Sequence, residues 1–124
     1  MSEYTREEIM SMTEPQLQIE AAKLLGWEKL FIHGLETVWY VDKTGRNRPG
    51  PPPASWETVG AIVEALIEKE VFLDISVGSD KRWNVDINIP TLRDKEYLTF
   101  AGESEGDTAF IAVTRAALMA VNNL

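Results

Sequence analysis

The spacing of hydrophobic residues between positions 55 and 124 changes from helical to alternating and back again. Apolar residues recur at three- and four-residue steps over residues 56–67 and again at helical steps after residue 107. Between them they occupy every second position over residues 73–77 and 83–89, on either side of a turn at residues 78–80. A period near 3.6 is typical of an amphipathic helix, and a period of two is typical of a strand with one buried face. The pattern predicts a helix, three strands and a second helix.

Single residues mark the expected ends of these elements. Ser55 can cap the first helix, and Ser104 or Asp107 the last, by accepting a hydrogen bond from a first-turn amide. Pro90 ends the second strand because it lacks the amide that a ladder needs. The third strand is expected at residues 97–101.

The predicted sheet has one apolar face and one polar face. The side chains expected to point into the core are Leu73, Ile75, Trp83, Val85, Ile87, Leu98 and Phe100. Those expected on the opposite face are Asp74, Ser76, Arg82, Asn84, Asp86, Asn88, Tyr97 and Thr99. Two amphipathic helices on the apolar face would close a core. The polar face is then a solvent surface, a surface covered by the N-terminal helices, or a recognition surface for a polar ligand or protein.

Residues 5–26 predict two short helices with a break near Met12. Thr5 and Thr13 each begin a capping-box sequence, with a glutamate or glutamine three positions later. Gly26 fits a left-handed C-cap. Because the segment also carries apolar side chains, we expect it to pack on the domain or against a partner subunit.

Residues 28–54 combine two apolar runs with a proline-rich stretch. Apolar runs at residues 30–32 and 37–41 predict strands, which would add a fourth strand to the sheet. Residues 42–54 include four prolines between positions 49 and 53, and prolines at that density block both helix and ladder. We expect an extended, exposed loop there, carrying the densest cluster of positive charge in the chain.

The length of the chain indicates one domain. At 124 residues and 44% hydrophobic composition, a single core can bury about two thirds of the unfolded surface. We expect an N-terminal helical segment at residues 1–27, a strand and proline-rich loop at 28–54, and the αβββα core at 55–124. The fold class is α+β, with an antiparallel sheet of three to four strands packed against helices.

Charge and composition exclude several classes of function. The chain has 20 acidic and 12 basic residues, a net charge of −8, so it repels a phosphate backbone and general nucleic-acid binding is disfavoured. It has no cysteine, no apolar run near the ~20 residues of a membrane span, and an acidic start where a signal peptide is basic. We expect a cytoplasmic protein that does not interact with membranes.

No catalytic motif is present in the sequence. His33 is the only histidine, so neither a histidine pair for a metal nor a serine or cysteine relay is available. The glycines do not have the spacing of a phosphate-binding loop. We therefore expect no catalytic residue, no metal and no cofactor, and interpret the chain as a non-enzymatic binding protein.

Four stretches resemble the phage ABA-sandwich domain proteins, which are small proteins of phages and prophages. The stretches are YTREEIM at residues 4–10, AAKLLGW at 21–27, ASWETVGAIVE at 54–64 and GDTAFIAVTRAAL at 106–118. The resemblance covers nearly the whole chain except residues 28–48. It implies an α-β-α sandwich and a viral or prophage origin, and it implies no reaction.

The size and layout also resemble the first Thoeris anti-defence sponge family, phage proteins that sequester cyclic ADP-ribose isomers made by TIR-domain immune enzymes. Sites in that family use arginines, an aromatic stack and strand asparagines in an oligomer. The resemblance implies a homo-oligomer and ligand-binding roles for Arg115, Arg82, Asn84, Tyr97 and Trp39. The amides near the start of the last helix add Asp107 and Thr108 as candidates for binding an anion. Guanidinium groups and helix-terminal amides suit a pyrophosphate, and an aromatic plane suits a purine.

Two hypotheses for the function follow. The first is an anti-defence sponge that sequesters a nucleotide immune signal, such as a cyclic ADP-ribose isomer or a cyclic oligonucleotide. The alternative is an acidic protein-binding inhibitor or accessory factor that acts on a host or phage protein. A concave pocket with convergent arginine and aromatic groups favours the first, and an open acidic face favours the second.

Overall fold

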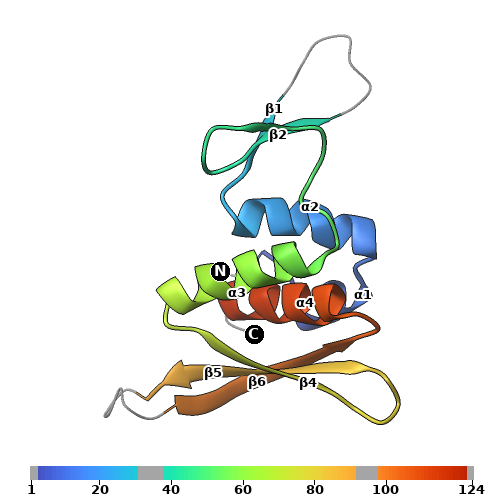
Figure 1. The fold of residues 1–124 in the computed structure, drawn as a ribbon. Helices are drawn as coiled ribbons and strands as arrows, with labels where there is room; N and C mark the ends of the chain where they lie inside the picture. Colours follow the sequence, from blue (N-terminus) through green and yellow to red (C-terminus); the bar gives the residue numbers. More distant parts are fainter. Residues whose placement is uncertain (1–2, 31–37, 92–97, 123–124) are drawn as a thin grey trace.

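A computed structural model of the chain describes residues 3–30, 38–91 and 98–122. In chain order its elements are α1 (Arg6–Ser11), α2 (Glu14–Leu24), β1 (Glu28–Leu30), β2 (Trp39–Val41), β3 (Asn47–Arg48), α3 (Trp56–Glu68), β4 (Phe72–Val77), β5 (Trp83–Pro90), β6 (Leu98–Gly106) and α4 (Ala109–Val121). They form an α+β fold in which a helical layer separates a large antiparallel sheet from a small one (Figure 1). The predicted class, and the predicted order of helix, three strands and helix, are confirmed. Within the described ranges, no helix has the length and hydrophobicity needed to cross a bilayer.

Helix α4 lies at the centre of the molecule. It packs against β5 and β6 on one side and against α2 and α3 on the other, and α1 also contacts it (Figure 1). Its side chains are buried around nearly the whole circumference, including those of Phe110, Val113, Ala116 and Met119. A helix that is apolar on nearly every side must be enclosed by other elements. All three remaining helices therefore share the core that α4 builds.

The two N-terminal helices form as predicted and pack on the domain. Thr5 and Thr13 each close a capping box, and Gly26 adopts the left-handed conformation with φ of 74°. Ile9 and Leu17 are completely buried in the common core. α2 therefore covers α4 on the side away from the large sheet (Figure 1), whereas α1 reaches that sheet, where Arg6 donates a hydrogen bond to the Glu103 carbonyl of β6 at 3.0 Å.

β1, β2 and β3 form a sheet of their own, so the prediction of a fourth strand in the large sheet is wrong. Residues 31, 32 and 37 of the two predicted strands lie outside the described residues. β2 pairs with β1 on one side and with β3 on the other, all antiparallel. The turn between β2 and β3 is closed by Asp42, whose Oδ1 accepts hydrogen bonds from the amides of Thr44 and Arg46. The prediction of an exposed loop over residues 42–54 is also wrong in part, because Asp42 and Pro52 are buried.

The third strand of the large sheet is longer than predicted and is offset by a bulge. Ile87 pairs with Gly102, but the next residue, Asn88, pairs with Phe100, so one residue of β6 is skipped. Because one residue is skipped, the side chains of β6 before Gly102 point to the opposite side of the sheet from that expected. Phe100 and Leu98 are accordingly 59% and 52% exposed. The prediction that both point into the core is therefore wrong. β4 is an edge strand, and its Ile75 is also exposed despite being expected in the core.

Two predicted helix caps differ in the structure. Ser104 lies within β6, and the cap of α4 is Thr108, whose hydroxyl accepts a hydrogen bond from the Ile111 amide at 3.2 Å. Neither Ser104 nor Asp107 fills that role. Ser55 does occupy the N-cap position of α3, but its hydroxyl makes no capping hydrogen bond.

Candidate functional site

The large sheet has one face without a cover. α3 and α4 lie against one side of β4, β5 and β6, and no described element lies against the other (Figure 1). We call this second side the open face; strand alternation and pairing assign to it Phe72, Asp74, Ser76, Asn84, Asp86, Asn88, Phe100, Glu103 and Glu105. The predicted polar face is confirmed for Asp74, Ser76, Asn84, Asp86 and Asn88. Thr99, predicted there, pairs with Ile89 beyond the bulge and lies on the other side.

A row of three carboxylates crosses the open face. Asp74 pairs with Asp86, and Asp86 pairs with Glu103, so the three acids are direct cross-strand neighbours. Like charges in directly opposed positions destabilise a sheet. Asp74 accepts a hydrogen bond from Asn88 Nδ2 at 3.0 Å, and none of the three acids joins an ion pair within the described ranges. Over the same ranges no acidic group is arranged to hold a metal ion, so the row is a charged surface.

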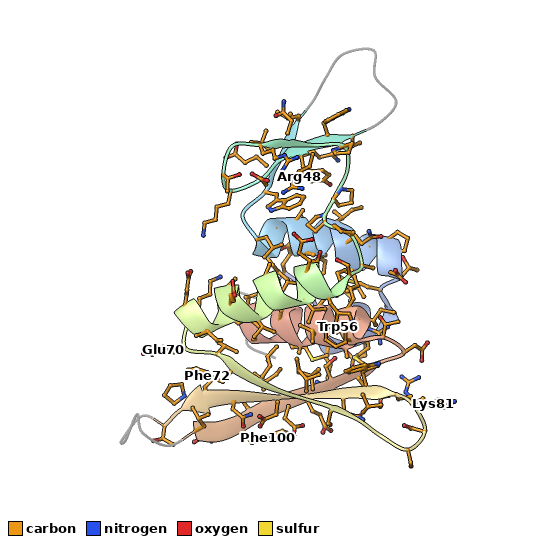
Figure 2. All side chains as sticks on the ribbon, in the orientation of Figure 1. Arg48, Trp56, Glu70, Phe72, Lys81 and Phe100 are labelled. Carbon is orange, nitrogen blue, oxygen red and sulfur yellow. The ribbon has the colours of Figure 1, made fainter. Side chains whose placement is uncertain are left out.

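Apolar side chains border this row at the start of β6. Phe72, Asn88 and Phe100 form the neighbouring cross-strand row, and Leu98 lies just beyond it. Phe100 points away from the helices (Figure 2). An exposed aromatic ring beside charged groups is a feature of protein–protein interfaces, where aromatic side chains anchor the contact. The open face therefore combines negative charge with an apolar anchor.

The other end of the sheet holds two arginines. Arg82 donates hydrogen bonds to Asp107 at 2.7 Å and to Glu105 at 3.5 Å. Arg115 donates to the backbone carbonyls of Glu105 at 2.9 Å and of Met12 at 3.5 Å. We call Arg82, Glu105, Asp107 and Arg115 the arginine corner. Burial lowers the pKa of Arg115, and the nearby positive charge of Arg82 lowers it further.

The remaining predicted ligand-binding residues are divided between two places. Asn84 lies on the open face near the arginine corner, and its Nδ2 donates to the Arg82 carbonyl at 3.4 Å. Thr108 also lies at this end, but its hydroxyl is used as the cap of α4. Trp39 lies in β2 of the small sheet, on the far side of the helical layer (Figure 1). Tyr97 lies outside the described residues.

The chemistry of the corner differs from that of an empty phosphate site. Both guanidinium groups already donate to oxygen atoms of this chain, and Glu105 and Asp107 place negative charge beside them. A phosphate would have to displace these carboxylates from Arg82. The open face as a whole therefore attracts cations more readily than anions.

The sequence interpretation missed a second polar cluster at the small sheet. The Asp42 carboxylate accepts from the Thr44 hydroxyl at 2.6 Å and from Arg48 Nε at 2.9 Å, and Arg48 lies 5.6 Å over the ring of Trp27. The hydrogen bond from Thr44 and the ion pair with Arg48 hold the pKa of Asp42 well below its usual range. The Asp-x-Thr-Gly stretch at residues 42–45 signals the turn. The position of Trp27 has no such local signal.

Comparisons of the chain with protein-family models, with curated proteins and with solved structures find no match. Charged side chains gather at the open face, at the arginine corner and at the small-sheet cluster. Of these, the open face presents the largest set of acidic side chains that join no ion pair with another described residue.

Proposed function

We propose that this protein is a non-enzymatic inhibitor or accessory factor, of phage or prophage origin, that binds a basic surface of a host or phage protein through its open face. The observation that carries the proposal is the row formed by Asp74, Asp86 and Glu103. These carboxylates oppose one another directly, lack ion-pair partners among the described residues, and lie beside the exposed ring of Phe100.

Charge and apolar surface would contribute to binding at different stages. A net charge of −8 attracts a basic partner at long range and speeds the encounter. At contact, lysine or arginine side chains of the partner would relieve the repulsion within the carboxylate row, while Phe100 and Leu98 would lose exposed apolar surface. Charge then sets the choice of partner, and the aromatic anchor supplies much of the affinity.

The test is a titration calorimetry measurement with a short synthetic peptide that carries lysine, arginine and aromatic residues. We expect wild-type protein to bind it with an affinity that falls as salt is added. Asp86→Asn and Phe100→Ser should each weaken binding by about tenfold or more, a change of roughly 1.4 kcal/mol. Glu28→Gln is the matched control, since Glu28 is an exposed strand acid opposite the neutral Val41.

Three results would count against this function. Equal loss of affinity in Asp86→Asn and Glu28→Gln would mean that only net charge matters. An unchanged affinity in Phe100→Ser would remove the apolar anchor. The absence of any binding to the basic peptide would remove the proposal as a whole.

A second candidate function, the nucleotide sponge, is favoured by one observation. Arg82 and Arg115 converge at the end of the sheet beside the first turn of α4, where helix amides favour an anion. It ranks second because Glu105 and Asp107 already neutralise Arg82. In this candidate a homo-oligomer would take up a cyclic ADP-ribose isomer or a cyclic oligonucleotide.

A thermal-shift screen distinguishes the sponge from the first candidate. The panel is cyclic ADP-ribose isomers, cyclic di- and trinucleotides and NAD, with Arg115→Ala as the site variant. A ligand at about 1,000 times its dissociation constant adds about 4 kcal/mol to stability and raises the melting temperature by several degrees. A shift with one nucleotide class that Arg115→Ala abolishes would favour the sponge, and flat curves across the panel would remove it.

A further inference from the structure

A pocket of about 490 Å³ lies between the helical layer and the small sheet, away from the open face. Its walls come from the end of α2, from Trp27, from the turn after β2, from the proline run and from one side of α3. The volume is in the usual range for a small-molecule site. Figure 2 shows Arg48 between the small sheet and the helices, at the border of this space.

The α3 wall explains why the pocket exists. The α3 residues that line it include Thr58, Ala61 and Ala65, which recur at three- and four-residue steps and therefore share one side of the helix. Small side chains on that side leave room between α3 and the opposing Pro52 and Pro53. The α3 wall between these residues is thus lined mainly by small side chains.

The charges at the pocket are unequal. Glu57, Glu64 and Glu68 line it from α3, are exposed, and join no ion pair within the described ranges. On the opposite wall, Arg48 is neutralised by Asp42 at 2.9 Å, which leaves Lys43 as the lining cation without such a pair. Negative charge therefore remains in excess, and a phosphate-bearing ligand is repelled.

The spacing of the three glutamates favours an extended ligand. Glu64 and Glu68 are one helical turn apart, roughly 6 Å along the axis, and Glu57 lies roughly 10 Å before Glu64. Ammonium groups joined by short aliphatic chains span comparable distances. Between them, the methylene groups of such a ligand can lie on Ala61 and Ala65.

We propose that this pocket is a binding site for a linear aliphatic polyamine, with its ammonium groups paired to Glu57, Glu64 and Glu68 and its chain lying on the small residues of α3. The site is separate from the open face, and its occupant is a small cation instead of a protein. On the wall opposite α3, Asp42 pairs with Arg48 and Arg48 lies over the ring of Trp27, so contacts within the chain connect these three lining residues.

The test is a calorimetric titration of the full chain with spermidine and putrescine, and with Mg²⁺ as a cation without an apolar chain. We expect spermidine to bind more tightly than putrescine, and Mg²⁺ to give no saturable binding at the same concentrations. Glu64→Gln should weaken spermidine binding by about tenfold. Asp86→Asn, which removes the same charge from the open face, should leave the affinity unchanged.

A second variant tests the position of the ligand by filling the pocket, and it leaves the charge of the protein unchanged. Ala61→Leu enlarges a side chain on the α3 wall of the pocket and should abolish spermidine binding, while thermal unfolding without ligand confirms that the variant is folded. Equal weakening by Glu64→Gln and Asp86→Asn, binding of Mg²⁺ as tight as that of spermidine, or normal binding by Ala61→Leu would each overturn the site. The absence of spermidine binding to the wild type would do so as well.

Discussion

Asp74 and Asp86 occupy directly paired positions on β4 and β5, with both carboxylates exposed on the same face of the sheet. Glu103 extends this arrangement to β6. Paired positions of this kind usually hold side chains that attract one another. The chain therefore carries a local electrostatic strain at the surface that we assign to partner binding.

Replacing the central acid should stabilise the isolated protein. In Asp86→Asn the repulsion of both neighbours is lost, and we expect the free energy of unfolding to rise by about 0.2–1 kcal/mol at low salt. Added salt should shrink the difference from the wild type. Urea denaturation measures both effects. Glu28→Gln is the control, and an equal gain in that variant would mean that the effect comes from net charge alone.

Two phenylalanines should respond in opposite ways to truncation. Phe110 is buried in the core beneath the sheet, so Phe110→Ala should cost about 3–5 kcal/mol of unfolding free energy. Phe100 is 59% exposed, so Phe100→Ala should change stability by less than about 1 kcal/mol. Thermal unfolding compares the two. A large loss in Phe100→Ala would contradict its outward position and the bulge that produces it.

Two glycines provide a matched pair for close packing. A Cβ at Gly106 would lie 2.7 Å from Ile111 Cγ2 and 2.9 Å from the Ala112 amide nitrogen, so Gly106→Ala should lose about 1–3 kcal/mol. A Cβ at Gly60, inside α3, meets nothing within 4 Å. Gly60→Ala should therefore gain about 0.5–1 kcal/mol from helix propensity. Similar melting temperatures for the two variants would contradict the tight contact of β6 with α4.

Asn122 should hold the start of the described chain in place. Its Oδ1 accepts hydrogen bonds from the amides of Glu3 at 2.8 Å and Tyr4 at 3.3 Å, and its Nδ2 donates to the Leu118 carbonyl at 2.7 Å. Asn122→Ala should cost about 1–3 kcal/mol because buried polar groups lose their partners. Hydrogen exchange should speed up at residues 3–12 before it does in β5. Unchanged exchange there would remove the anchoring role.

Acid should weaken the small sheet through Asp42. Hydrogen bonds from Thr44, Arg48 and Arg46 hold the pKa of Asp42 in the folded state below its usual value. The ionised carboxylate therefore contributes its full stabilisation above the unfolded-state pKa, which is near 4. That stabilisation is lost as the pH falls from the unfolded-state pKa toward the folded-state pKa. Denaturation at pH values from about 7 to 3 should give a falling stability, with a shallower fall in Asp42→Asn and Thr44→Val. An unaltered slope in Asp42→Asn would exclude this source.

Local signals in the sequence account for much of the fold. The capping boxes at Thr5 and Thr13, the left-handed Gly26 and the period-two alternation of β5 each depend on near neighbours, so the sequence predicts them. The outward turn of Phe100 depends on which residue of β6 is skipped opposite β5. The position of this bulge depends on how β5 and β6 pair, so the alternation of residues within β6 alone cannot predict it.

The open face could be predicted from local sequence patterns, whereas the pocket could not. Alternation alone predicts that Asp74, Asn84 and Asp86 share one face of the sheet, and the strand pairing confirms this. The pocket brings Trp27 and Arg48 together with α3, and these residues meet only because the strands of the small sheet pair with one another. No periodicity within residues 28–54 specifies that pairing.

The central position of α4 has a consequence for how the two surfaces can work together. The large sheet, with its open face turned outward, lies on one side of the helical layer (Figure 1). The pocket lies on the other side of that layer, against the small sheet. A protein partner and a polyamine would therefore bind at separate sites without steric conflict. Under the two proposals made above, the protein would hold both species at once, and the same excess of negative charge would attract each of them.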